Sequence, residues 1–128
     1  MGAGSRLIAA LIGERFELPP DLLRSYPELG QASYRRGGVP VRIGGWALRS
    51  STAAAITLRR TIFLAAETPL SAELLLHELR HVHQFSEHWA FPVSYLWQSI
   101  RYGYSRNAYE VDARRYSASR LGTVDKDL

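Results

Sequence analysis

The chain has 128 residues, of which 46% are hydrophobic and 22% charged, a composition typical of a folded domain with a single core. It contains no cysteine, which excludes disulfide bonds, thiolate metal ligands and cysteine nucleophiles. Sixteen lysines and arginines against twelve aspartates and glutamates give a formal net charge of +4, and the arginines occur at most in pairs, so we expect a solvated surface and no nucleic-acid partner.

Residues 1–38 are expected to form a helical and loop segment. The spacing of apolar residues predicts a short helix over residues 6–15, and two flanking prolines bound a second one over residues 21–26. Residues 30–38 are polar and predict a loop. We expect short antiparallel strands after it, with Arg59 and Arg60 forming a tight turn. The predicted strands cover residues 39–43, 46–49, 55–58 and 61–65.

Three helices are predicted in the C-terminal half. Thr68 and Pro69 supply an N-cap and a first-turn proline for a helix over residues 70–85. Further helices are expected over residues 92–102 and 107–120. Strands followed by helices predict an α+β fold, in one domain over residues 1–128 with its catalytic core at residues 39–120.

Membrane association is not expected from the apolar pattern. No apolar run approaches the roughly 18 residues that a membrane-spanning helix requires. The apolar stretch at residues 7–12 is followed by charged residues where a signal-peptide cleavage site would lie. We therefore expect no membrane partner and, by default, a cytoplasmic location.

The helix predicted over residues 70–85 carries the motif His-Glu-Leu-Arg-His at residues 77–81. On a helix, His77 and His81 are separated by about 40° around the axis and about 6 Å along it, so both imidazoles can reach one metal ion. Glu78 lies at the border of the same face, where it can act as a general base without being a ligand. An apolar stripe formed by Leu75, Leu79 and Val82 provides a packing face.

Two histidines and an adjacent glutamate predict one zinc ion per chain, with one coordination position open. Zinc lowers the pKa of its bound water towards neutrality, and Glu78 would take the proton as that water attacks a carbonyl. We therefore expect a zinc-dependent endopeptidase that hydrolyses peptide bonds in extended peptide or protein segments. A catalytically weak or inactive zinc-binding scaffold or cargo module is the alternative.

The third protein ligand is less constrained by the sequence. A metzincin would carry glycine and histidine at the positions held by Gln84 and Glu87, which excludes that class. Glu110, at the start of the last predicted helix, is the favoured ligand, as in gluzincins. Because Asn107 precedes it by three residues, the pair could instead form a capping box.

Other candidate ligands remain open beside Glu110. They are Glu87, His88 and Asp112. His83 lies about 160° around the helix from His81 and is expected to stay away from the metal.

Residues 74–85 and 107–113 together resemble the minimal gluzincins and the related small metallopeptidase-like domains encoded near bacterial contractile injection systems. The resemblance implies zinc ligands at His77, His81 and Glu110, with Glu78 as the base. It also implies a small antiparallel sheet packed on the active-site helix, and a last strand, residues 62–65, that pairs with an extended substrate.

The sequence departs from this pattern at Arg114, where thermolysin-like gluzincins carry an aspartate that orients a zinc histidine. Asp112 is one replacement for that aspartate. No oxyanion-stabilising residue is assigned by spacing. The tyrosine candidates are Tyr102, Tyr104, Tyr109 and Tyr116.

Overall fold

The computed structural model describes residues 2–38 and 55–122. It divides into two compact units, Met1–Pro69 and Leu70–Leu128, which are described separately below. The first contains a four-stranded mixed sheet and the second contains three helices, which confirms the predicted α+β class. The prediction of one domain over the whole chain stays a prediction.

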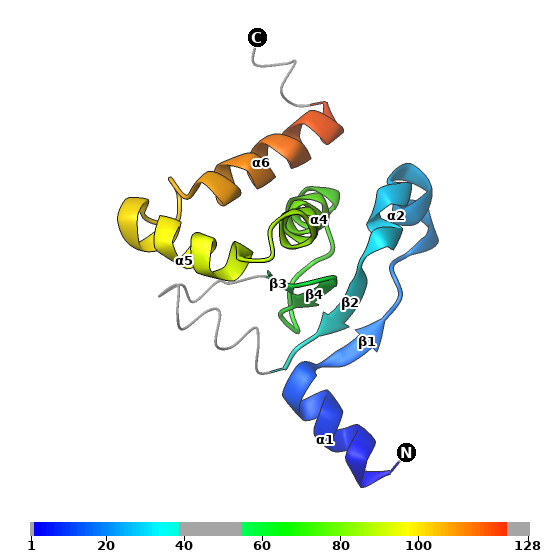
Figure 1. Cartoon of the computed structure of the whole chain (residues 1–128). Coiled ribbons are helices and arrows are strands. Elements are labelled where there is room, and N and C mark those ends of the chain that lie inside the picture. The colour runs from blue at the N-terminus through cyan, green and yellow to red at the C-terminus, as the bar shows by residue number, and fades with distance from the viewer. Residues whose placement is uncertain (1, 39–54, 123–128) are drawn as a thin grey trace. The chain divides into compact units, whose positions relative to one another are not determined.

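The first unit is built on the sheet, whose strands follow the order β1-β2-β4-β3 (Figure 1). Strand β4 pairs with β3 antiparallel and with β2 parallel, while β1 pairs with β2 antiparallel. The sheet is therefore mixed, where the sequence predicted an antiparallel one. The elements of this unit are α1 (Ala3–Ile12), β1 (Glu14–Phe16), α2 (Pro20–Ser25), the 3-10 helix η1 (Pro27–Gln31), β2 (Ser33–Arg36), β3 (Ala55–Leu58) and β4 (Thr61–Leu64).

Strand β4 lies inside the sheet. Ile62 is paired with Tyr34 of β2 on one side and with Thr57 of β3 on the other. Its backbone groups are thus used by two neighbouring strands, and the expectation that this strand pairs with an extended substrate is wrong. The three consecutive apolar residues Ile62, Phe63 and Leu64 are all buried, as is common for an interior strand covered on both faces.

Strands β1 and β2 were not predicted, because their residues lack an alternating apolar pattern. Residues 33–36, expected to form a loop, pair with β4, and Arg36 donates hydrogen bonds to the carbonyls of Ala65 and Thr68. Gly13 precedes β1 at a positive φ of 76°, and a Cβ there would overlap the carbonyl oxygen of Arg36. Only glycine fits this approach of two backbone segments.

The second unit consists of α4 (Ala72–Glu87), α5 (Phe91–Tyr102) and α6 (Ala108–Leu121), close to the three helices predicted. Ser71, rather than Thr68, caps α4 by accepting a hydrogen bond from the Leu74 amide. Helix α6 packs along α4, as Figure 1 shows. The predicted stripe of α4 is buried, together with Leu76. That stripe fixes which face of α4 remains for chemistry.

Each end of helix α6 lies one residue from the predicted range of 107–120. The side chain of Asn107 caps it by accepting a hydrogen bond from the Tyr109 amide, and Gly122 ends it in the left-handed conformation. Among the described helices, none is both long and apolar enough to cross a membrane. The strands predicted over residues 39–43 and 46–49 lie outside the described residues.

Candidate metal centre

The motif histidines and Glu78 come together on one side of α4. One donor atom each from His77, Glu78 and His81 lies within 4.8 Å of the other two, so this group could hold a metal ion. The two imidazole rings meet edge to face, with centroids 5.1 Å apart. Glu78 and His81 are buried and His77 is partly exposed. The cluster is therefore largely buried, and His77, with its side chain 15% exposed, is its most accessible histidine.

Glu110 approaches the same point from α6. Its Oε1 atom lies 3.5 Å from Nε2 of His77 and in direct contact with Nε2 of His81. The Glu110 carboxylate does not form a capping box, because the backbone amide of Asn107 donates to the carbonyl of Tyr104 and not to Glu110. The structure therefore brings together the four residues that the sequence predicted, three from α4 and one from α6.

The contacts of Glu110 fit a metal ion better than a hydrogen-bonded cluster. Its side chain is only 1% exposed, and Oε1 is buried without a hydrogen-bond partner although two imidazole nitrogens lie beside it. A buried carboxylate oxygen normally finds a donor. Two imidazole nitrogens and one carboxylate oxygen pointing at one place form the donor set that zinc prefers.

Gln84 determines which nitrogen of His81 faces Glu110. The side-chain amide of Gln84 donates to the Tyr109 carbonyl at 3.0 Å and to Oδ2 of Asp112 at 2.9 Å. Both partners only accept hydrogen bonds, so the Gln84 oxygen is the atom 2.7 Å from Nδ1 of His81, and Nδ1 must carry the proton. The lone pair of neutral His81 is then on Nε2, directed at the metal position.

Asp112 completes this chain of contacts through Arg80. The guanidinium Nε of Arg80 donates to the same Asp112 oxygen at 2.6 Å. Burial raises the pKa of Asp112, but the hydrogen bonds from Arg80 and Gln84 outweigh it and hold the pKa below its ordinary value. The residue suggested by sequence as a replacement for the missing aspartate thus acts on His81 through Gln84. The sequence did not predict this role for Gln84.

The pKa values of Glu110 and His81 are shifted in opposite directions. Burial raises the pKa of Glu110, but the adjacent imidazoles of His77 and His81 and the Tyr104 hydroxyl outweigh burial, so the pKa lies below its ordinary value. Burial lowers the pKa of His81, but the contacts with Glu110, Glu78 and Gln84 outweigh it and raise the pKa. The carboxylate is therefore ionised and available as a ligand.

Aromatic side chains of α5 and the following loop border the site. The ring centroids of Phe91 and Tyr95 lie 6.2 Å and 6.0 Å from that of His81. The Tyr104 hydroxyl hydrogen-bonds to the Glu110 carboxylate. Tyr104 was among the four tyrosines singled out by sequence, whereas Tyr95 was missed because its α5 position has no spacing signal relative to the motif.

The other candidate ligands lie elsewhere. Glu87 is exposed and lies 4.0 Å from Arg80, while His88 is exposed at the C-terminal end of α4. The ring of His83 packs edge to face against Tyr116, away from the motif histidines as expected. The tertiary contacts therefore favour Glu110 over Glu87, His88 and Asp112.

Replacing Gln84 with leucine tests its positioning of His81. The leucine keeps most of the buried volume but cannot accept the Nδ1 proton, so we expect zinc affinity to fall by about 10- to 100-fold, the usual cost of losing a group that orients a metal ligand. Competition with a chelating dye measures this affinity directly. Gln98→Leu on α5 is the matched control, and equal affinities in the two variants would exclude the positioning role.

Among known protein families, one family model matches part of this chain. A family model described as the eCIS core domain, where eCIS denotes extracellular contractile injection system, matches residues 37–88, less than half of the chain. The matched part includes β3, β4 and α4 with His77, Glu78 and His81, and it ends before Glu110. Searches of curated proteins and of solved structures gave no significant match.

Proposed function

We propose that this chain is a zinc-dependent endopeptidase of the gluzincin type, with His77, His81 and Glu110 as metal ligands and Glu78 as general base. The observation that carries the proposal is the convergence of both imidazole Nε2 atoms on the buried, unpartnered Oε1 of Glu110. Glu78 lies in the same cluster without being needed as a third ligand. This division of roles is what metal-assisted hydrolysis requires.

Zinc is the metal that suits the donor set. Two imidazoles and one carboxylate, with no thiolate in the chain, match catalytic zinc sites that have three protein ligands. When bound, zinc supplies a Lewis acid that activates water and polarises a carbonyl. Among the described residues, His77, Glu78 and His81 are the group that could hold a metal ion, and Glu110 reaches both imidazoles, so we expect one zinc per chain.

The remaining chemistry is assigned to side chains of this chain. The carboxylate of Glu78 accepts the proton of the attacking water and passes it to the leaving amine. Burial raises the pKa of both Tyr95 and Tyr104 above the ordinary tyrosine value, so both hydroxyls stay protonated and can donate hydrogen bonds. The single hydroxyl proton of Tyr104 is already directed at Glu110, so Tyr95, whose ring lies 6.0 Å from that of His81, is the better placed to donate to a developing oxyanion.

The substrate we propose is an extended peptide or an unstructured protein segment. Strand β4 does not provide its binding edge, because both of its sides are paired. The match to the eCIS core domain supports a role associated with a contractile injection system. The second candidate function is a zinc-binding scaffold or cargo module without efficient turnover, which requires only the metal-binding capacity of His77, Glu78 and His81.

A peptide-library assay separates the two candidate functions. The purified chain is incubated with a broad library of unstructured peptides, either loaded with zinc or treated with a chelator, and new peptide termini are detected by mass spectrometry. We expect cleavage that requires zinc and returns when zinc is restored. Stoichiometric zinc without any cleavage would reject the endopeptidase and leave the scaffold.

A further inference from the structure

Helix α5 has two faces with different surroundings. Phe91 is buried and Tyr95 lies beside it, both against the ring of His81. The opposite side carries large apolar residues within an arc of about 100°, as calculated from 100° per residue. These residues, with Trp89 from the preceding turn, are Val93, Leu96, Trp97 and Ile100, and they form what we call the α5 stripe.

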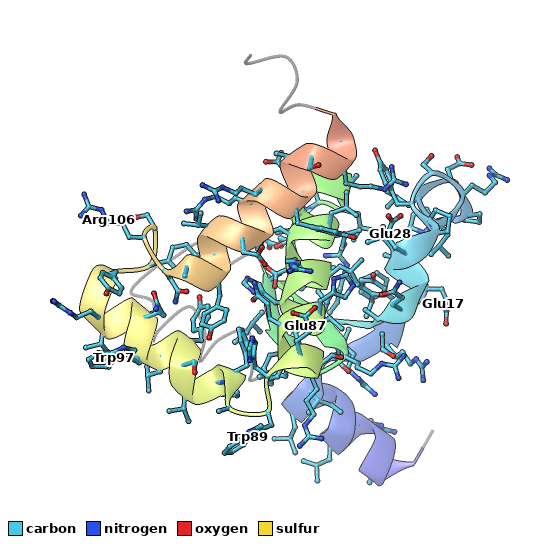
Figure 2. All side chains as sticks on the ribbon, turned by 45° about the horizontal axis from the view of Figure 1, so that its top comes forward. Glu17, Glu28, Glu87, Trp89, Trp97 and Arg106 are labelled. Carbon is cyan, nitrogen blue, oxygen red and sulfur yellow. The ribbon has the colours of Figure 1, made fainter. Side chains whose placement is uncertain are left out.

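The α5 stripe is strongly exposed. The exposed fraction of its side chains runs from 59% at Trp97 to 96% at Trp89. Figure 2 shows Trp97 projecting from α5 on the side away from α6, and Trp89 projecting from the turn before α5. Isolated exposed apolar residues are ordinary on a protein surface, whereas a continuous stripe along a helix indicates a binding surface.

The charges around the α5 stripe have one sign. Residues 88–109 contain no aspartate or glutamate, and their two formal positive charges are Arg101 and Arg106. Both arginines are exposed, one in the last turn of α5 and one in the following loop. A surface that combines exposed tryptophans with arginines and lacks carboxylates is complementary to a negatively charged partner.

We propose that the α5 stripe binds the interfacial region of an anionic lipid bilayer. The side chains of the stripe project from the outer side of one helix. They can therefore insert into a deformable surface such as a bilayer. Tryptophan and tyrosine prefer the boundary between water and lipid because their rings are apolar and carry a polar group. Arg101, four residues after Trp97, lies about 40° from it around the helix and so borders the stripe, while Arg106 adds an exposed positive charge in the following loop. No membrane partner was expected because the chain lacks a spanning run, but an interfacial helix does not need one.

Lipid binding through this face would bring the candidate metal centre close to the membrane. The residues that border His81 and the residues of the α5 stripe belong to the same 12-residue helix, so they are separated only by the thickness of that helix. The inference does not depend on the proposed peptidase activity, because it concerns the outer side of α5.

Vesicle flotation of the full chain tests the proposal. The probes are vesicles of phosphatidylcholine alone and vesicles with equal parts of phosphatidylcholine and phosphatidylglycerol. We expect the chain to float with the anionic vesicles, to bind the neutral ones weakly, and to dissociate as salt is raised. Failure to bind anionic vesicles at low salt would overturn the proposal.

Matched substitutions locate the binding surface. Leu96 in the α5 stripe and Leu7 on α1 have the same exposed fraction, 61%. Leu96→Gln should weaken binding to anionic vesicles by about fivefold to tenfold, since one inserted leucine is lost, while Leu7→Gln should leave it unchanged. Equal losses in both variants would overturn the assignment to α5. Circular dichroism and zinc content verify that both variants are folded.

Two further measurements distinguish lipid from protein partners. Arg101→Gln combined with Arg106→Gln should reduce the preference for phosphatidylglycerol, whereas Arg115→Gln, an exposed arginine of α6, should not. Sedimentation without vesicles measures self-association. A dimer that Leu96→Gln converts to monomer would show that a second copy of this chain occupies the stripe, and would overturn the lipid proposal.

Discussion

Peptide cleavage by Glu78→Gln is expected to fall by roughly 10²- to 10⁴-fold with zinc still bound near one per chain, because a general base typically contributes that factor to rate. Glutamine keeps the size of the side chain but cannot accept a proton from water. Glu78 is buried within the motif cluster, while the ligands His77, His81 and Glu110 are unchanged in this variant. Rates of peptide cleavage and zinc content by elemental analysis are measured on the same sample.

Glu73→Gln is the control for this substitution. Glu73 lies in the first turn of the same helix, is exposed, and is not part of the candidate metal-binding cluster, so its loss should leave cleavage near that of the wild type. If Glu78→Gln cleaves as fast as the wild type with zinc bound, Glu78 is not the base and the mechanism proposed above is wrong.

Glu110→Gln is expected to lower zinc affinity by more than the 10- to 100-fold that loss of an orienting group typically costs, since a charged ligand itself is removed. Glutamine preserves the packing of this buried side chain between α4 and α6. Zinc that binds the native state raises its thermal stability by mass action, so the melting temperature of the wild type should fall on chelation. In Glu110→Gln that difference should shrink or disappear.

Glu87→Gln provides the matched control for the ligand. Glu87 was a candidate ligand from sequence, yet it is exposed and lies near Arg80 rather than the motif histidines. Its substitution should leave zinc affinity and the effect of chelation unchanged. Wild-type affinity in Glu110→Gln, together with reduced affinity in Glu87→Gln, would move the third ligand to the end of α4.

The sequence determined those features that depend on local periodicity and capping. The spacing of Leu75, Leu79 and Val82 predicted a helix with one buried face, and the same period placed His77 and His81 on one side of it. The predicted helix over residues 107–120 corresponds to α6, which Asn107 caps. These signals are contained within a few turns of one helix, so no tertiary information was needed to interpret them.

The tertiary structure decided which distant groups meet. The sequence left Glu110, Glu87, His88 and Asp112 open as ligands, and the packing of α6 on α4 selects Glu110 because it is the carboxylate brought to both imidazoles. The sequence offered Asp112 as a partner of a zinc histidine, but it gave no reason to place Gln84 between Asp112 and His81. The contact between Gln84 and Asp112, 28 positions apart in the chain, depends on the register between α4 and α6.

The sheet shows the same division. The apolar residues in 55–58 and 61–64 predict two short strands. The turn between them, at Arg59-Arg60, involves only neighbouring residues, so it too could be predicted from the sequence. Strand β2 is polar in sequence and becomes a strand because β1 pairs with it on one side and β4, from a remote part of the chain, pairs with it on the other. Since backbone hydrogen bonds between strands carry no side-chain signature, the position of β4 inside the sheet, with both edges paired, could be established only from the folded structure.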